Sequence, residues 1–283
     1  MFKFRSPQVA IHCWGGLGSQ LYAIALRIEL EEKYPKRSFY FVAHESGVTL
    51  RKSELEYFYP GAVTKIQDFM NTTSGTKDKV PSFEWFKKII KYFVVKIGLI
   101  VDGDSVDAVD TLRTWTTQIR GHYSTRMIQK KTLGLISQKL FDTNQNLGTK
   151  NLPKSINVHY RLGDLLNLPS KSPISKSRVI DVLRNLQIKT GLGITLHSDS
   201  TVIALKYLTG GTIKKITAEE LSPIETLRSL TASPYFVGTN SKISAWAVLL
   251  SIDDKARVES HLPKELNHHL YANVGSLNNL FYY

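Results

Sequence analysis

One short segment of the sequence combines residue types that bind an anion: His159-Tyr160-Arg161-Leu162-Gly163-Asp164. The planar guanidinium of an arginine bonds two phosphate oxygens at once and keeps its charge. His159 and Arg161 are two positions apart, so on a strand they share one face. This pattern favours a phosphate-bearing ligand. The alternative is a strand end with a purely structural pair between Arg161 and Asp164.

The residues around this segment predict a buried strand that ends in a tight turn. Residues 156–160 form a short β-rich run, which Arg161, Gly163 and Asp164 interrupt. Gly163 gives the turn its conformational freedom. The rest of the second half alternates strands at 193–199, 213–216 and 235–238 with helices at 175–189, 201–208, 222–230 and 241–252. Such alternation implies a parallel sheet with right-handed crossovers. The helix at 222–230 is predicted to begin with a capping box formed by Ser222 and Glu225, with Pro223 at its first position.

Polar residues stand at the ends of two further predicted strands. They are Ser198-Asp199-Ser200 and Thr239-Asn240-Ser241. Because ligands bind at the carboxyl ends of strands in open α/β sheets, the three strand ends together predict a nucleotide site. Asp199 can accept from the paired donors of a guanine, or only cap the next helix. Ser241 and its neighbours can hold an anion at a helix N-terminus, or only cap that helix.

The first half begins with the same type of unit. A strand at 9–14 precedes Gly15-Gly16-Leu17-Gly18, and a helix follows at 19–33 with Ser19 as its expected N-cap. A glycine turn before a helix lets an anion approach closely, although such turns also close βα units without any ligand. Further strands are predicted at 38–43 and 118–123 and a helix at 125–141. The turn-rich residues 142–153 predict a linker between lobes at 1–150 and 151–283.

Composition limits the classes of protein and partner. The 283 residues are 42% hydrophobic and 22% charged, with one cysteine, Cys13, and a formal net charge of +13. The N-terminus lacks the apolar core of a signal peptide, and no apolar run reaches a membrane-spanning length, so we expect a cytoplasmic protein. The basic residues are dispersed and form no RNA-binding motif, so nucleic acid is not the expected partner.

One basic stretch is amphipathic. Within residues 84–100, aromatic and aliphatic side chains surround Lys87, Lys88, Lys91 and Lys96. This pattern is typical of an interfacial helix in peripheral contact with an anionic membrane. A core helix whose lysines extend to solvent explains it equally well.

Five motifs, in order along the chain, resemble those of the alpha-1,2-fucosyltransferases of glycosyltransferase family 11. Residues 159–164 resemble the family's H-x-R-x-G-D, and residues 15–25 its G-G-L-G-N-Q opening, with Ser19 in place of asparagine. Residues 120–124 and 239–248 are similar to the G-Y-x-Q-S and N-S-S-F-S-W-W-A-A segments. Residues 197–200 resemble F-S-D-D, with His197 and Ser200 replacing the phenylalanine and the second aspartate.

The resemblance implies an α/β fold of the GT-B type, in which two Rossmann-like lobes with mainly parallel sheets face a cleft. It also implies that the C-terminal lobe binds GDP-L-fucose. Arg161 would bind the diphosphate as the catalytic residue, and His159 and Asp199 would place the guanine. The other implied donor-binding residues are Asn240, Ser241 and Ser244 near the phosphates, with Gly16 and Gly18 on the opposite wall. Ser200 removes an expected anchor, which points to a related donor such as GDP-colitose as an alternative.

The implied reaction is an inverting transfer to a galactoside hydroxyl of a surface glycan, such as an O-antigen repeat. A lipid-linked glycan at the inner membrane face would suit such a cytoplasmic enzyme. No metal or cofactor is expected, because the one D-x-D sequence, Asp102-Gly103-Asp104, is predicted to lie in a loop with no strand before it. The candidates for a general base are His44, Glu45 and His122. The alternative of a different class is a GDP-sugar-binding module without catalysis.

Overall fold

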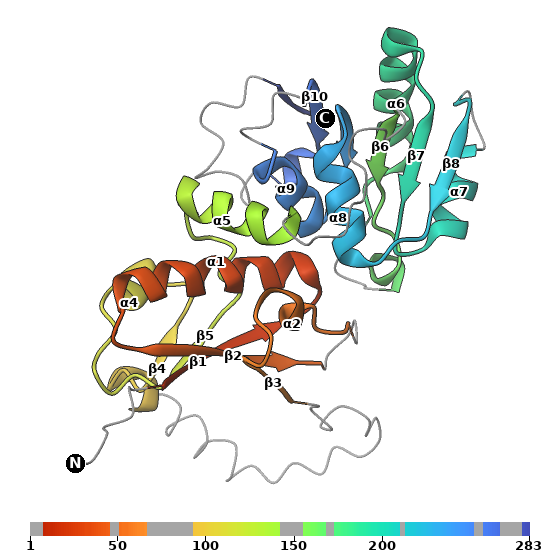
Figure 1. Ribbon diagram of the computed structural model, residues 1–283. Coiled ribbons are helices and arrows are strands. Elements are labelled where there is room, and N and C mark those ends of the chain that lie inside the picture. Colours follow the sequence, from red (N-terminus) through yellow and green to blue (C-terminus); the bar gives the residue numbers. More distant parts are fainter. Residues whose placement is uncertain are drawn as a thin grey trace, which may run out of the picture. The chain divides into compact units, whose positions relative to one another are not determined.

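The computed structural model describes residues 8–45, 51–66, 93–141, 155–167, 173–209, 213–251, 257–266 and 279–283. The chain divides into two compact units, Met1–Arg126 and Met127–Tyr283, each built on its own parallel sheet (Figure 1). The predicted boundary near residue 150 lies outside the described residues, and the observed division falls earlier. Helix α5 (Lys130–Phe141) therefore belongs to the second unit, where the Leu140 carbonyl accepts a hydrogen bond from the Arg228 guanidinium.

The first unit has a five-stranded sheet in the order β3-β2-β1-β5-β4, with every pair parallel. Chain order reverses between β1 and β5, so their carboxyl ends form a topological switch point. The strands are β1 (Gln8–Trp14), β2 (Ser38–His44), β3 (Val63–Ile66), β4 (Ile100–Asp102) and β5 (Gln118–Arg120). The helices are α1 (Leu17–Lys33), α2 (Leu55–Phe58) and α4 (Val106–Asp110), of which α1 packs along the sheet (Figure 1).

Helix α1 begins two residues earlier than predicted, and Ser19 is not its N-cap. Gly15 has a φ of +84°, which turns the chain sharply at the end of β1. The carbonyl of Gly16 then accepts from the backbone N–H groups of Ser19 and Gln20, so Gly16 takes the N-cap position. A positive φ favours glycine, and this is the physical reason why a glycine stands at position 15.

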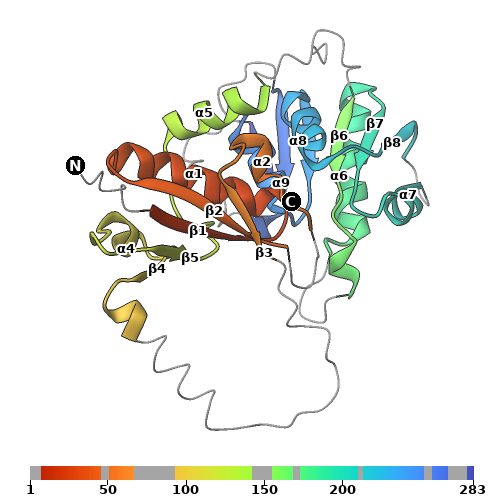
Figure 2. The ribbon, with the colours of Figure 1, turned by 60° about the horizontal axis from the view of Figure 1, so that its bottom comes forward.

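The second unit has a six-stranded sheet in the order β11-β10-β9-β6-β7-β8, again with every pair parallel. Strands β6, β7 and β8 are seen side by side in Figure 2. Chain order reverses between β6 and β9, which is the strand order of a dinucleotide-binding Rossmann sheet. The strands are β6 (Ile156–His159), β7 (Ile194–His197), β8 (Ile216–Glu219), β9 (Tyr235–Gly238), β10 (Glu259–Leu262) and β11 (Leu280–Tyr282). The other elements are α6 (Lys176–Thr190), α7 (Thr201–Thr209), α8 (Pro223–Ala232), α9 (Lys242–Leu249) and the 3₁₀ turns η3 (Asp164–Asn167) and η4 (Lys264–Leu266).

The two faces of this second sheet differ in chemistry. Val158 and Leu196 point to the face that packs on α6 and α7, where they join a hydrophobic cluster with Val179, Leu183 and Ala204. Asn157, Thr195 and His197 point to the opposite face, and Asn157 donates to Ser229 on α8. Helix α8 starts with the capping box that the sequence predicts, since the Ser222 hydroxyl accepts from the Glu225 N–H and the Glu225 carboxylate accepts from the Ser222 N–H.

Two predictions concern residues 84–104. The amphipathic helix lies partly outside the described residues, and the loop around Asp102 needs correction. Of the expected amphipathic helix, residues 84–92 are not described. Residues 93–96 are helical, Gly98 turns the chain with a φ of +76°, and Ile100 already begins β4. The expectation that Asp102 follows no strand is wrong, because Asp102 is the last residue of β4, which pairs with β5. No helix in the described part of the chain is long and apolar enough to cross a membrane.

Candidate functional site

The segment after β6 lies at the switch point of the second sheet and is held by its neighbours on both sides. The Thr239 hydroxyl accepts the Arg161 N–H at 2.9 Å and donates to the His159 carbonyl at 2.9 Å. Oδ1 of Asp199 accepts the N–H groups of Leu162 and Gly163 at 2.9 and 3.0 Å. Three successive backbone amides, 161 to 163, are thereby fixed by side chains from the ends of β9 and β7.

The carbonyl oxygens of the same segment are also bound. Ser198 donates its hydroxyl to the Tyr160 carbonyl at 2.6 Å. The Tyr160 hydroxyl donates to the carbonyl of Ile174, which anchors the segment from the far side of the sheet. Burial raises the pKa of Tyr160 to about 12, so this phenol stays a proton donor. The half-buried Arg161 therefore projects from a backbone that is fixed before any ligand binds.

Close packing around Gly163 explains why a glycine stands at the turn. A Cβ atom there would lie 3.0 Å from Oδ2 of Asp199 and 3.2 Å from Oγ of Ser200. The two hydrogen bonds that Asp199 accepts from Leu162 and Gly163 require this close approach. Asp199 is itself exposed at the end of β7. The structure thus gives this carboxylate a structural contact, and the role in guanine recognition that the resemblance implies stays a prediction.

His159 is held from the α9 side. Its Nδ1 lies 2.9 Å from the hydroxyl of Ser244, a residue with no exposed surface. At Gly238, which pairs with His159 across β6 and β9, a Cβ atom would lie 2.6 Å from Cβ of Ser244. Glycine at position 238 therefore lets α9 approach the sheet closely enough for this bond. Ser244 thus orients His159, and its predicted place near phosphates stays untested.

The N-terminus of α9 carries the other predicted anion ligands. Ser241 is the N-cap, and its hydroxyl accepts from the backbone N–H of Ile243. Ser241 is buried, whereas Asn240 is half-buried. The helix N-terminus and Arg161 thus meet the same switch point, since Thr239, which holds the Arg161 amide, lies two residues before the cap. A negatively charged group at this point would be stabilised by both.

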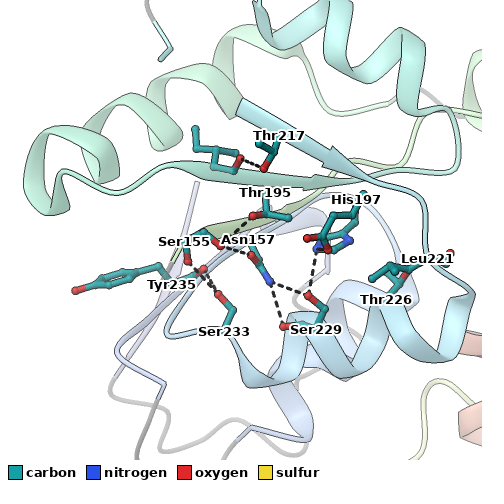
Figure 3. Close-up of polar contacts among 12 residues, drawn as sticks. Ser155, Asn157, Thr195, His197, Thr217, Leu221, Thr226, Ser229, Ser233 and Tyr235 are labelled. Atoms are coloured by element: carbon teal, nitrogen blue, oxygen red, sulfur yellow. Dashed lines mark hydrogen bonds and ion pairs between the residues drawn. The ribbon is translucent and has the colours of Figure 1, made fainter. Parts of the chain in front are cut away.

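A layer of buried polar side chains continues beneath the site, between the sheet and α8 (Figure 3). The Asn157 amide group donates to both the carbonyl and the hydroxyl of Ser229, each at 3.1 Å, and its oxygen accepts from Ser155. Nε2 of His197 lies 3.4 Å from the Ser229 hydroxyl. His197 is 1% exposed, and its burial lowers its pKa to about 4. This histidine is therefore neutral at physiological pH and belongs to the packing of α8.

The predicted glycines lie in the first unit. A Cβ atom on the half-buried Gly16 would lie 2.8 Å from Cδ of Arg51, so this glycine makes room for an arginine side chain. Gly18 is buried in the first turn of α1. Gln20, which sequence reasoning did not single out, ties this turn to the next segment: it donates to the Gly15 carbonyl and accepts from the Glu54 N–H.

The three predicted base candidates have different surroundings. His44 ends β2, lies 2.8 Å from Nδ1 of His12 through its Nε2, and stacks on Trp14. The Glu45 carboxylate accepts from the Ser53 N–H and pairs with Lys65 at 3.5 Å. His122 is exposed, and its backbone N–H donates to Asp104.

The two aspartates of the D-x-D sequence accept hydrogen bonds from backbone N–H groups. Oδ1 of Asp104 accepts the N–H groups of His122 and Tyr123 at 3.0 and 2.6 Å, while Oδ1 of Asp102 accepts the N–H of Asp104. These bonds join the ends of β4 and β5. In the described ranges, no group of three or more His, Cys, Asp or Glu side chains is placed to hold a metal ion.

Comparison with known proteins identifies the fold. No protein-family model and no curated protein matches the sequence. The UDP-GlcNAc 2-epimerase from Methanocaldococcus jannaschii is 11% identical, covers 98% of this chain and 88% of its own, and gives a TM-score of 0.50. E. coli heptosyltransferase WaaC with ADP-2-deoxy-2-fluoro heptose is 11% identical over 98% of this chain and 92% of its own, with a TM-score of 0.49. NodZ alpha-1,6-fucosyltransferase co-crystallized with GDP is 12% identical over 87% and 93%, with a TM-score of 0.48.

At such low sequence identities, the similarity concerns the fold and not the reaction. The chain has the α/β architecture of the GT-B type, with two Rossmann-like units that each carry a parallel sheet. The predicted fold class is confirmed. Family 11 is not distinguished from other proteins of this architecture, so the chemistry has to be argued from the residues of the site.

Proposed function

We propose that the protein is a glycosyltransferase that moves L-fucose from GDP-L-fucose to a galactoside hydroxyl, forming an alpha-1,2 linkage with inversion. The observation that carries this proposal is the segment 159–163, fixed at the switch point by Thr239 and Asp199, with Arg161 projecting from it. An arginine on a preorganised backbone suits a leaving diphosphate, because its charge is in place before the reaction begins. The five motifs that resemble those of family 11, in the same order along the chain, support GDP-L-fucose as the donor and the alpha-1,2 linkage of the product.

The chemistry requires one bond to form and one to break. The acceptor oxygen forms a bond to the anomeric carbon as its proton leaves, and the bond from that carbon to the β-phosphate oxygen breaks with its electron pair remaining on GDP. The transition state has oxocarbenium character. Arg161 and the N-terminus of α9 stabilise the negative charge that grows on the phosphate, so we propose a reaction without a metal or cofactor.

Asp199 has two roles in this proposal. One carboxylate oxygen holds the amides of Leu162 and Gly163. The exposed carboxylate also accepts from the paired donors of guanine, whereas the carbonyl oxygens of uracil would be repelled. His159, oriented by Ser244, lies close to the base. Asn240 and Ser241 take the phosphates together with Arg161.

A lipid-linked glycan at the inner membrane face is the proposed acceptor, reached by peripheral contact. Four side chains of the first unit support this contact because they are large, hydrophobic and exposed: Phe93, Val95, Ile97 and Trp115. Lys96 and Arg113 are exposed among them and can meet anionic lipid. Flotation with phosphatidylglycerol vesicles tests the contact: we expect binding at low salt and release at high salt, and a folded protein that stays unbound at low salt contradicts it.

The deciding experiment for the activity is GDP release. GDP-fucose and lactose supplied together should release GDP in excess EDTA, and the product should carry an alpha-1,2-linked fucose. A protein that only binds GDP-sugars would be stabilised by the donor in a thermal-shift screen of GDP, UDP, CMP and GDP-fucose, without turnover. Turnover of GDP-colitose but not of GDP-fucose would establish the related donor, for which Ser200 is the supporting residue. Activity that EDTA removes and manganese restores would exclude the metal-free reaction.

A further inference from the structure

Tyr283, which follows β11 directly, contacts the switch point of the second sheet through its side chain. Its hydroxyl donates to the carbonyl of Gly238, the last residue of β9, at 2.7 Å. The Tyr283 side chain is half-buried and packs against the hydrophobic cluster on the α6 face of the sheet. Burial raises the pKa of the Tyr283 phenol well above its ordinary value, so the hydroxyl stays a proton donor. None of the roles described above uses this contact.

The ladder between β9 and β10 cannot supply a donor to the Gly238 carbonyl. In this parallel pairing, the Pro234 carbonyl accepts from the Glu259 N–H at 3.1 Å. Bonds of one series recur at every second residue of both strands, so the donor that the series assigns to the Gly238 carbonyl is the N–H of residue 263. That residue is Pro263, which has no N–H. The phenol of Tyr283 therefore supplies the donor that the ladder lacks.

The Gly238 carbonyl belongs to the peptide unit that leads into Thr239. Because a peptide unit is planar, its carbonyl and its N–H move together. Tyr283 donates to the carbonyl of this unit, and the N–H of Thr239 donates to the His159 carbonyl at 3.1 Å. The unit is thus held on both sides. Thr239, which has no exposed surface, is thereby fixed where its hydroxyl accepts the Arg161 N–H.

The same peptide unit is linked to the N-terminus of α9. The Thr239 carbonyl accepts the Ser241 N–H at 2.6 Å, directly before the helix begins. A Cβ atom at Gly238 would lie 2.5 Å from Cδ2 of Leu262, so the unit packs closely against β10. A displacement of this unit would therefore move both groups that the proposed function places at the diphosphate, Arg161 and the N-terminus of α9.

Tyr283 is itself held by an arginine on α6. Arg178 donates to the two carboxylate oxygens of Glu265 at 2.8 and 3.3 Å, and its Nη2 also donates to the Tyr283 carbonyl at 2.6 Å. The guanidinium lies 5.5 Å from the centre of the Tyr283 ring. The Tyr283 N–H donates to the Leu262 carbonyl at 3.1 Å. Because these contacts order the ring, its hydroxyl reaches Gly238 at little further cost in conformational entropy.

Resting on the proposed transfer, we propose that Tyr283 is a positioning residue of the donor site. Its hydroxyl fixes the peptide unit between Gly238 and Thr239, and this unit fixes the backbone of Arg161 and the N-terminus of α9. Tyr283 acts through these groups and contacts no reacting atom. Its effect is directed at the phosphates, because the guanine contact proposed for Asp199 comes from β7, which does not pair with β9.

The first test measures this coupling without any ligand. In hydrogen exchange of the full chain followed by NMR, the amides of Arg161 and Thr239 should exchange about fivefold faster in Tyr283→Phe, the effect of one lost hydrogen bond. The Ile194 amide, on β7, is the internal reference. Tyr235→Phe is the matched control, because Tyr235 is also half-buried against the hydrophobic cluster but lies at the other end of β9. Unchanged exchange of the first two amides, or equal acceleration of all three, overturns the inference.

The second test separates the phosphates from the base. In calorimetric titrations, the Kd of Tyr283→Phe for GDP and for inorganic pyrophosphate should rise about fivefold, while its Kd for guanosine stays nearly the same. Tyr235→Phe should change none of the three. An unchanged Kd for GDP, or a rise for guanosine as large as that for GDP, overturns the inference.

Failure of the proposed function gives a different result. A native protein that binds GDP but transfers no sugar contradicts the proposed function, and the comparison of Kd values still decides the role of Tyr283. A native protein that binds neither GDP nor pyrophosphate overturns both.

Discussion

The hydroxyl of Ser244, on α9, lies 2.9 Å from Nδ1 of His159, on β6, and both side chains are buried. The bond fixes the orientation of the imidazole from a residue that has no exposed surface. It also depends on Gly238, whose missing side chain leaves the space that Ser244 occupies. The imidazole of the proposed donor site is thus oriented from the side of α9.

Replacing Ser244 by alanine should therefore weaken the binding of GDP. A buried hydrogen bond is worth about 1 kcal/mol, so we expect the Kd for GDP to rise about fivefold. Isothermal titration calorimetry measures this change. Ser251→Ala is the matched control, because Ser251 is also a buried serine after α9 but donates to the Val248 carbonyl. Equal effects of the two variants on the Kd would contradict the role of Ser244.

Gly163→Ala should displace the segment that carries Arg161. The new Cβ would lie 3.0 Å from Oδ2 of Asp199, closer than most such contacts, so the two bonds from Asp199 must lengthen or break. We expect donor affinity and turnover to fall at least about tenfold, or about 1.4 kcal/mol. Gly134→Ala, in α5 where a Cβ meets open space, should leave both unchanged and raise the free energy of unfolding by up to about 1 kcal/mol.

Arg161→Lys should keep the charge and lose the two-pronged contact with the diphosphate. Turnover should fall at least about tenfold while the melting temperature stays the same, because Arg161 is only half-buried. The matched control is Arg184→Lys, since Arg184 is also half-buried, lies on α6 and pairs with Asp181 at 3.4 Å. Native turnover in the purified Arg161→Lys variant would show that the assigned role is wrong.

Two substitutions at Asp199 separate guanine recognition from the contact with the backbone. Asp199→Asn keeps an oxygen for the amides of Leu162 and Gly163 but loses the negative charge, whereas Asp199→Ala loses both. The preference for GDP over UDP should shrink in both variants, and only the alanine variant should also lose turnover through displacement of Arg161. Calorimetric titration with each nucleotide measures the preference. Equal affinity of the native protein for GDP and UDP would rule out the guanine role.

His197 should make the fold sensitive to mild acid. Its pKa is about 4 in the folded protein against an ordinary 6.5, so the unfolded chain binds the additional proton first and the free energy of unfolding falls as the pH drops from 7 to 4. The full loss is about 3 kcal/mol. Urea unfolding of His197→Phe at several pH values should show a weaker dependence than the native protein. His122→Phe, at an exposed histidine, is the control, and identical pH slopes in the native protein and His197→Phe would contradict this account.

The elements with a strong local pattern could be predicted from the sequence. The strand at 235–238 and the capping box of α8 agree with the structure because their signals lie within a few neighbouring residues. Strands β4 and β11, of three residues each, carry no such signal. Their conformation depends on pairing with β5 and β10, which are distant in sequence.

The same distinction holds for the site. Sequence reasoning places His159, Asp199 and Ser241 at successive strand ends. It does not reveal that Asp199 and Thr239 bind the backbone of the segment after β6, because these bonds join residues 36 to 78 positions apart. A threonine directly after a predicted buried strand is the available signal. The His12–His44 contact spans 32 positions and is equally invisible to a pattern of neighbouring residues.

The contrast between the two faces of the second sheet has a consequence for how the chain finds a single fold. Side chains alternate along a strand, so a slip of β6 by one residue would exchange Asn157 for Val158 at each face. If both faces were hydrophobic, packing would penalise such a slip weakly, because apolar side chains of similar size replace one another readily. The slip would, however, leave the Asn157 amide group without the Ser229 oxygens to which it donates. The buried polar layer therefore fixes the register of β6. Replacing its polar side chains with valines would increase the burial of apolar surface. It would also allow sheets with a shifted register, in which Arg161 no longer reaches the switch point.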